Sequence, residues 1–360
     1  NNIQKQINLF FKKQNMKKKS LSAKKKIPKL IIKYLNNKEF LRIFNEFKKS
    51  LNSKNKYAVA VSGGPDSLAL AYLSKCFSII YNARIYYYIV DHGLRQESSK
   101  EAKKVVSILK KFMINCKILV WKGNKPKSNI QSIARNNRYS LLIKECKKNN
   151  IKYILLGHHA DDQYENFLLR LLRGSGLRGL VSMDKVSKDS LQNIQFLRPL
   201  INIEKYKLKN ISQKVFDFFV EDPSNYDENF KRIRIRRLIK NLESEGLDKK
   251  KLELTIKNLK DSDQTINFYV KNNIDKNAIF LSNNNTYVLN KIFFNQPNEI
   301  IFRSFTYIMR KISSRYYSAR GKSISEIISK IKFKKLKKVT LGGCIIEQIN
   351  ETILISREIT

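Results

Sequence analysis

The sequence has few cysteines, and none of them belongs to a paired motif. Cys76, Cys116, Cys146 and Cys344 are isolated, and no CxxC pair occurs. This spacing excludes a zinc knuckle and indicates no disulfide framework. Four free thiols in a chain of 360 residues are typical of a reducing compartment, so we expect a cytoplasmic protein.

Long apolar runs are missing as well. No stretch approaches the run of about 18 apolar residues that a membrane span requires. The N-terminal residues also lack the apolar segment and small-residue cleavage site of a signal peptide. We therefore expect no membrane partner. The sequence does not begin with Met, and Met16 is a candidate for the biological start.

Acidic residues are scarce relative to basic ones. The chain has 72 Lys and Arg against 30 Asp and Glu, a formal net charge of +42. Such an excess predicts a polyanionic partner, either a nucleic acid or an anionic membrane surface. Lys, Asn and Ile are abundant everywhere, which is also typical of an A+T-rich genome. Clusters of Arg near a site are therefore the stronger indication of an anionic partner.

Strands and helices alternate from residue 57 onward. Short apolar and β-branched runs predict strands, and longer runs with helical spacing predict helices. This alternation is typical of βαβ units, so we expect an α/β fold whose parallel twisted sheet has helices on both faces. The predicted strands are 57–61, 85–90, 116–121 and 153–157, and the predicted helices are 67–81, 97–113, 129–149 and 160–173.

The chain is long enough for two or three domains. The predicted segments are a basic extension and helix (1–56), the α/β domain (57–220), a mostly helical linker (221–300) and a small α+β module (301–360). The first segment holds 17 Lys and Arg against 2 Asp and Glu. The last one ends in two predicted strands, 339–347 and 353–358, with a polar turn between them.

The hexapeptide Ser62-Gly63-Gly64-Pro65-Asp66-Ser67 lies between a predicted strand and a predicted helix. Gly63 and Gly64 let the backbone approach a ligand closely, and the helix N-terminus offers unpaired N–H groups. Together with the serine hydroxyls, this pattern predicts a phosphate cradle. It differs from the P-loop GxxxxGKS/T because no Lys follows the glycines. The alternative is an ordinary strand–helix turn in which Asp66 is favoured by the helix dipole.

Two other predicted strands also end in polar sequence. Asp91-His-Gly-Leu-Arg95 follows the strand 85–90, and His158-His-Ala-Asp-Asp162 follows the strand 153–157. The carboxyl ends of parallel strands meet at one edge of a sheet, where ligands bind. The three strand ends therefore predict one active site.

The segment from His158 to Asn166 concentrates acidic residues. On a helix, Asp161 and Glu165 are i,i+4 neighbours. One interpretation is a Mg²⁺ site with oxygen ligands, and another is a general base that deprotonates an amine nucleophile. Acidic capping of the helix is a third. A two-histidine zinc site is a weaker fourth, because adjacent histidines cannot share a helix face.

Two groups of arginines stand out against the lysine background. Both suit contacts to a phosphate backbone, and both are also compatible with a solvated turn or basic helix face. They are Arg170, Arg173 and Arg178 around the glycine-rich segment 174–179, and Arg232, Arg234, Arg236 and Arg237 beyond Pro223.

Taken together, the motifs resemble those of the tRNA(Ile)-lysidine synthetases, a family of PP-loop ATP pyrophosphatases. The matching motifs, in family order, are SGGPDS (62–67), DHGLR (91–95), HHADDQYEN (158–166), RGSGLRGL (173–180), RPL (198–200) and EDPSN (221–225). The family tends to carry Arg-Asn after the last motif, whereas here Arg232 is followed by Ile233.

The resemblance implies a ligase that joins free L-lysine to C2 of the wobble cytidine in the CAU anticodon of isoleucine tRNA. ATP first adenylates the cytidine, and the product lysidine reads AUA instead of AUG. ATP and Mg²⁺ are the implied cofactors. Residues 57–220 would be the catalytic domain, and residues 221–300 would help to bind tRNA. The oligomeric state is undecided, and a homodimer stays open.

The resemblance also assigns roles to single residues. Ser62, Gly63, Gly64, Pro65, Asp66 and Ser67 would bind ATP. Asp66 and Asp162 would hold Mg²⁺, and Asp161 or Glu165 would bind the lysine ammonium or take its proton. His158 and Arg95 would contact the adenylate or the cytosine. The predicted tRNA contacts are Arg170, Arg173, Arg178, Arg232, Arg234 and Arg236.

Three other functions are compatible with parts of the sequence. A PP-loop tRNA thiolase that makes 2-thiocytidine would need cysteine pairs, which are absent. A PP-loop amidotransferase or synthetase acting on a free metabolite would not need the basic charge. A non-catalytic RNA-binding protein would not need an intact hexapeptide.

Overall fold

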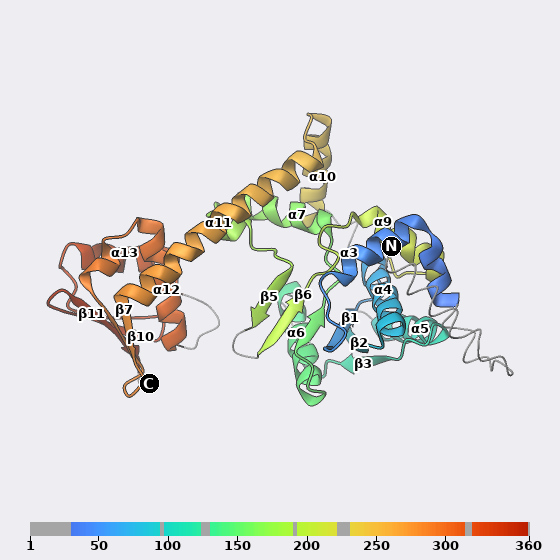
Figure 1. Ribbon diagram of the computed structural model, residues 1–360, viewed down its shortest axis with the longest axis horizontal. Coiled ribbons are helices and arrows are strands. Elements are labelled where there is room, and N and C mark those ends of the chain that lie inside the picture. The colour runs from blue at the N-terminus through green and yellow to red at the C-terminus, as the bar shows by residue number, and fades with distance from the viewer. Residues whose placement is uncertain are drawn as a thin grey trace. The chain divides into compact units, whose positions relative to one another are not determined.

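The structure is a computed structural model that describes residues 30–93, 97–123, 130–189, 193–221, 231–313 and 319–358 (Figure 1). The chain divides into two compact units. The first comprises Asn1–Ser175 and Ser182–Lys249, and the second comprises Gly176–Val181 and Lys250–Thr360. Each unit is described by itself below. The four-segment division expected from the sequence stays a prediction.

The first unit is built on a six-stranded sheet with the order β3-β2-β1-β4-β6-β5. All pairings in it are parallel except that of β5 with β6. The strands are β1 (Lys56–Val61), β2 (Arg84–Asp91), β3 (Cys116–Val120), β4 (Tyr153–Leu155), β5 (Val186–Asp189) and β6 (Ile194–Leu197). The predicted parallel sheet is confirmed, and the β5–β6 hairpin at its edge is an addition.

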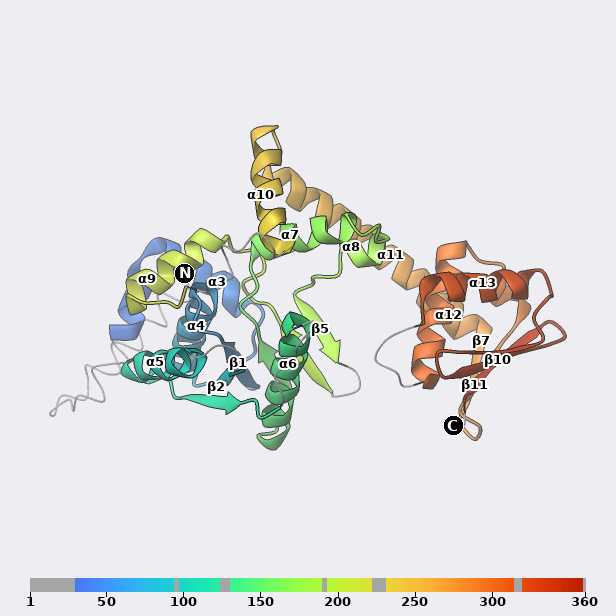
Figure 2. The same ribbon diagram turned by 180° about the vertical axis from the view of Figure 1, so that it is seen from behind.

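Helices pack on both faces of this sheet, as predicted (Figures 1 and 2). Alternate residues of β1 supply the two faces, because successive side chains of a strand point to opposite sides. Val59 packs with α4 and α9, while Ala58 packs with Leu142 of α6. The helices are η1 (Tyr34–Asn36), α3 (Lys38–Lys48), α4 (Pro65–Tyr81), α5 (Ser98–Lys111), α6 (Ile130–Lys148), α7 (Ala160–Leu171), α9 (Lys205–Phe216) and α10 (Lys231–Ser244).

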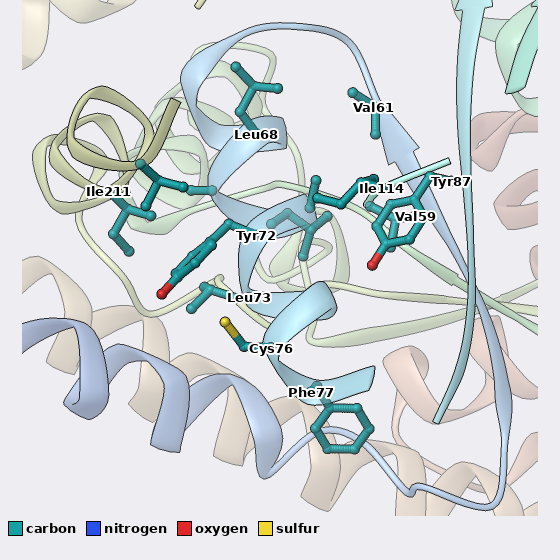
Figure 3. Packing of buried hydrophobic residues seen from close by; sticks show 14 of the residues in the cluster. Val59, Val61, Leu68, Tyr72, Leu73, Cys76, Phe77, Tyr87, Ile114 and Ile211 are labelled. Atoms are coloured by element: carbon teal, nitrogen blue, oxygen red, sulfur yellow. The ribbon is translucent and has the colours of Figure 1, made fainter. Parts of the chain in front are cut away.

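The central helix α4 carries the run Leu68–Leu73, which contains no charged residue and is buried throughout, and this explains its place in the core. Figure 3 shows Leu68, Tyr72 and Leu73 of this helix between the strand residue Val59 and Ile211 of α9. Each fully buried side chain of this size contributes about 1.5–3 kcal/mol to folding. The same burial fixes the N-terminus of α4, and therefore the hexapeptide, relative to the sheet.

The second unit carries an antiparallel sheet with the order β7-β8-β11-β10-β9. Ile301 and Phe305 of α12 and Ile324 of α13 pack on its buried face, where Ile346 and Ile355 lie. Its elements are α8 (Leu177–Leu180), α11 (Lys249–Asn277), β7 (Ala278–Leu281), β8 (Thr286–Leu289), η3 (Lys291–Phe294), α12 (Asn298–Ser313), α13 (Gly321–Lys332), β9 (Lys338–Leu341), β10 (Cys344–Ile349) and β11 (Thr352–Arg357).

The prediction of two C-terminal strands was wrong, because the structure has three. Gly342 and Gly343 both adopt positive φ, of 60° and 81°, inside the expected strand 339–347. Two consecutive residues of this kind form a tight hairpin turn, so the chain reverses between β9 and β10. The strands β7 and β8 were also missed, within a segment predicted to be mostly helical.

No helix in the described ranges is both long and apolar enough to cross a membrane.

Candidate functional site

A cavity of about 740 Å³ lies at the carboxyl ends of β1 and β2 and beside the N-termini of α4 and α7. This is the edge at which parallel α/β sheets bind ligands. All three predicted strand ends reach it. The residues from them that line it are Ser62, Gly64, Pro65, Asp66, Asp91, His92, His159 and Asp162, and the cationic residues from elsewhere are Arg138, Lys205, Lys209, Arg232 and Arg236.

The hexapeptide forms a rigid turn. The Ser67 hydroxyl accepts a hydrogen bond from the Ser62 N–H at 3.1 Å and donates one to the Gly64 carbonyl at 2.9 Å. Gly63 has a φ of +86°, and a Cβ there would lie 2.8 Å from Cγ2 of Val105. The Gly63 carbonyl accepts a hydrogen bond from the Val220 N–H at 3.0 Å. These contacts hold the loop in the shape of a cradle, and Pro65 begins the helix at a position that suits it.

Gly157 brings the loop before α7 against the start of α4. A Cβ at this position would lie 3.2 Å from the carbonyl carbon and oxygen of Asp66 and 3.3 Å from the Ser67 nitrogen. A residue with a Cβ would have to push the two backbones apart by a few tenths of an ångström. The contact sets the spacing between Asp66 and the acidic start of α7.

His159 lies buried among three carboxylates. Its Nε2 is 3.5 Å from Oδ2 of Asp66 and 3.5 Å from Oδ2 of Asp162, and its Nδ1 is 3.7 Å from Oδ2 of Asp161. Burial lowers the pKa of His159, but these carboxylates outweigh it, and the net shift is upward. Oδ1 of Asp66 is buried and has no hydrogen-bond partner among the described residues. Asp66 and Asp162 both line the cavity.

The predicted helix cap is present as well. Oδ2 of Asp162 accepts a hydrogen bond from the His159 N–H at 3.1 Å. Capping and cavity lining are thus combined in one residue.

The other two acids of α7 have partners of their own. Asp161 accepts a hydrogen bond from the Lys205 N–H at 2.9 Å and lies 3.4 Å from the Lys249 ammonium. Burial raises the pKa of Asp161, but these contacts lower it overall. Glu165 is 3% exposed and pairs through Oε1 with Nε of Arg236 at 2.5 Å, while its Oε2 is buried without a partner. Neither acid lines the cavity, although Arg236 does.

His159 lines the cavity, whereas His158 does not. Its Nδ1 accepts a hydrogen bond from Nε of Arg198 at 3.2 Å. Burial, together with the nearby Arg198, Arg135 and Arg232, lowers the pKa of His158 to about 4, against the opposing effect of Asp162. His158 is therefore neutral near pH 7. Arg95 lies outside the described residues, as do residues 222–225 of the EDPSN motif.

The six arginines predicted to contact tRNA lie in different parts of the structure. Arg232 and Arg236 line the cavity from α10. Arg234 lies on the same helix and is exposed. Arg170 lies in the last turn of α7, and Arg173 follows the end of that helix at Leu171. Arg178 lies on α8 and belongs to the second unit.

Several cavity residues were not among the predicted site residues. Asp91 accepts hydrogen bonds from the Gly93 N–H and the Ser98 hydroxyl, each at 2.9 Å, and fixes the loop after β2. Burial raises the pKa of Asp91, but these bonds and the Ser99 hydroxyl lower it overall. Arg138 donates to His92 at 3.4 Å. Lys205 and Lys209 come from α9, and their i,i+4 spacing was a visible signal that they share a helix face.

Comparison with known proteins decides the family. Residues 35–243 match the PP-loop domain family. The tRNA(Ile)-lysidine synthase of Wolbachia sp. subsp. Brugia malayi is 38% identical over 320 residues, which cover 84% of this chain and 71% of that protein. The chain belongs to the tRNA(Ile)-lysidine synthase family. The tRNA(Ile)-lysidine synthase of Orientia tsutsugamushi is 32% identical and is covered over 70% of its length.

A solved structure shares the fold of this tRNA(Ile)-lysidine synthase family member. The U34-tRNA thiolase NcsA from Methanococcus maripaludis, solved with its 4Fe-4S cluster, aligns with a TM-score of 0.52 at 18% identity, over 61% of this chain and 78% of that one. In this chain the four cysteines are buried in α4, β3, α6 and β10, and none lines the cavity.

Gly157→Ala tests the close approach of the two backbones. The added methyl must push the start of α4 away by a few tenths of an ångström, so we expect ATP turnover to fall about tenfold or more. Gly321→Ala is the control, because its Cβ would meet only an ordinary contact of 3.6 Å. Steady-state ATP turnover measures both variants, and wild-type turnover in Gly157→Ala would contradict the spacing argument.

Arg236→Met tests the buried ion pair. Removing the guanidinium leaves the Glu165 carboxylate buried without a cation, so the free energy of unfolding should fall by about 3 kcal/mol. The double variant Glu165→Gln/Arg236→Met should regain much of this loss, because no unpaired charge remains. Lys240→Met, an exposed change on the same helix, is the control. Urea unfolding provides the measurement, and equal stability of the single and double variants would be the contrary outcome.

Proposed function

We propose that this protein uses ATP to join free L-lysine to C2 of the wobble cytidine in the CAU anticodon of isoleucine tRNA. The products are lysidine, AMP and pyrophosphate, and the modified anticodon reads AUA rather than AUG. The observation that carries this proposal is an intact PP-loop hexapeptide at the cavity of a chain that belongs to the tRNA(Ile)-lysidine synthase family.

The first step is adenylation of the cytosine. Its O2 attacks the α-phosphorus of ATP, a new P–O bond forms, and the bond from the α-phosphorus to the bridging oxygen breaks. Pyrophosphate leaves with that electron pair. The Ser62–Ser67 cradle at the N-terminus of α4 suits this departure, because fixed N–H groups and the helix dipole stabilise negative charge.

Magnesium fits the carboxylate pair of the cavity. No group of three or more His, Cys, Asp or Glu side chains in the described ranges could hold a metal ion alone. Mg²⁺ is commonly held by one or two carboxylates together with substrate phosphates, and the unpartnered Oδ1 of Asp66 suits that arrangement. We therefore assign Asp66 and Asp162 to Mg²⁺. A bound ion would offset the negative charge of the phosphates.

In the second step the ε-amine of lysine attacks C2 of the cytosine. A C–N bond forms, the C2–O bond breaks, and AMP leaves with the oxygen. The amine must lose a proton, since its ammonium form cannot attack. Asp161 or Glu165 would bind the ammonium or take this proton. One observation supports each residue. Asp161 already attracts the Lys249 ammonium, and Oε2 of Glu165 has no hydrogen-bond partner among the described residues.

The remaining predicted residues serve the nucleic acid. A neutral His158 can donate a hydrogen bond from Nε2, because its Nδ1 accepts from Arg198. We propose that it and Arg95 contact the adenylate or the cytosine. Arg170, Arg173, Arg178, Arg232, Arg234 and Arg236 would contact tRNA phosphates. A homodimer stays a prediction.

The reaction is tested with purified protein, ATP, Mg²⁺, labelled lysine and two transcripts. We expect label in the isoleucine tRNA with the CAU anticodon, at the wobble cytidine, and none in the elongator methionine tRNA. Asp66→Asn and Asp162→Asn should each lower the rate at least about a hundredfold, because each removes charge that faces the phosphates. Asp217→Asn, at the end of α9, is the matched control. Activity of either active-site variant within a few fold of wild type would reject its assignment.

The proposed tRNA partner leads to a separate prediction, on how the binding affinity depends on salt concentration. Each phosphate contact made by Lys or Arg releases bound counterions, so tRNA affinity should fall steeply with ionic strength. Arg232→Gln should lower the slope of log affinity against log salt by about 1. Filter binding at several salt concentrations measures both slopes. A tRNA affinity that does not change with salt concentration would exclude binding through phosphate contacts.

A further inference from the structure

The hexapeptide lacks the lysine that a P-loop places beside the phosphates. Its own groups are hydroxyls and backbone N–H groups, which carry no formal charge. A leaving pyrophosphate bears several negative charges, so the site needs cations from elsewhere in the fold. Five cationic residues line the cavity in addition to its histidines, and two of them come from a helix far along the sequence from the hexapeptide: Lys205 and Lys209 of α9.

These two lysines have no ion-pair partner for their ammonium groups within the described ranges. Among the residues that the structure describes, neither forms a salt bridge, whereas Lys207 between them pairs with Glu204. Lys205 is half-buried and Lys209 is exposed at the cavity. A lysine at a cavity without a carboxylate partner is available to an anionic ligand, and the one-turn spacing places both on the same face of α9.

Three contacts fix α9 against the cradle. The Lys205 N–H donates to Asp161 at 2.9 Å, which ties the start of α9 to α7. The Ser212 hydroxyl donates to the carbonyl of Pro65 at 2.5 Å, which ties the same helix to the hexapeptide itself. The Lys209 ammonium lies 5.2 Å from the centre of the Phe219 ring, and the next residue, Val220, donates to the Gly63 carbonyl.

We propose that Lys205 and Lys209 bind the β- and γ-phosphates of ATP and stabilise the pyrophosphate as it leaves. They supply from α9 the positive charge that a P-loop lysine would supply from the loop. The inference rests on the proposed function, because it presupposes ATP in this cavity. When the bond from the α-phosphorus to the bridging oxygen breaks, negative charge grows on pyrophosphate, and fixed ammonium groups lower the cost of that charge.

Binding without tRNA or lysine tests this directly. Titration calorimetry with Mg²⁺ present would compare ATP, inorganic pyrophosphate and AMP on wild type, Lys205→Gln, Lys209→Gln and the double variant. We expect the affinity for ATP and pyrophosphate to fall about tenfold for Lys205→Gln and severalfold for the more exposed Lys209. AMP lacks the β- and γ-phosphates, so its affinity should stay within about twofold. Lys209→Arg should restore most of the affinity for pyrophosphate, because the charge is retained.

Lys207→Gln is the matched control, since it removes the same charge from the same helix between the two tested positions. Its ATP and pyrophosphate affinities should equal those of wild type. An equal loss in Lys207→Gln would show a general electrostatic effect and overturn the inference. So would an equal loss of AMP affinity, or unchanged pyrophosphate affinity in the double variant. Thermal melting by circular dichroism checks that each variant is folded.

The outcome is separable from that of the proposed function. If wild type binds ATP and pyrophosphate but puts no label into tRNA, the proposed reaction is overturned. The binding data would still decide the role of the lysines. If wild type forms lysidine while the Lys205 and Lys209 variants bind pyrophosphate normally, the proposed reaction stands and the proposed role of the two lysines is overturned.

Discussion

The close approach of two backbones at Gly157 is the constraint on which the site depends. The strand β4 ends at Leu155. Two residues later, at Gly157, an added Cβ would lie 3.2 Å from the Asp66 carbonyl and 3.3 Å from the Ser67 nitrogen, before the chain enters α7. The N-termini of α4 and α7 are thereby brought together at one edge of the sheet. Two helix dipoles then act on the same small volume, and both favour a bound anion. The geometry of the cavity follows from a residue that carries no functional group.

Charge balance explains how acidic residues can lie beside a site for phosphates. Asp66 and Asp162 share the buried imidazole of His159, and Glu165 is paired with Arg236. Without these partners, the carboxylates would repel a polyphosphate ligand. His159 and Arg236 hold the acids in place, and one oxygen of Asp66 has no hydrogen-bond partner among the described residues. The surrounding cations from α6, α9 and α10 favour an anionic ligand.

The central sheet could be predicted because its strands are continuous apolar runs that end in polar residues. The convergence of strand ends at one cavity followed from topology alone. The pairing of Glu165 with Arg236 could not be predicted, since 71 positions separate the two. Nor could the sequence show that His159 lines the cavity while His158 does not. Their positions depend on the backbone at the start of α7, where His159 is extended with φ of −130° and ψ of −178°. The strand β7 was missed because it follows the long helix α11 with no Gly or Pro between them.

The second unit is discontinuous in sequence, and this has a consequence for how the chain is made. Residues Gly176–Val181, which include α8, belong to the second unit although the chain on either side of them belongs to the first. During synthesis, this short helix leaves the ribosome some 70 residues before the rest of its unit begins at Lys250. The second unit is therefore made of two pieces of the chain that are synthesised at different times. A fragment that begins at Lys250 would lack the segment Gly176–Val181, which contains α8. The gene therefore cannot be divided at a single point into the two units.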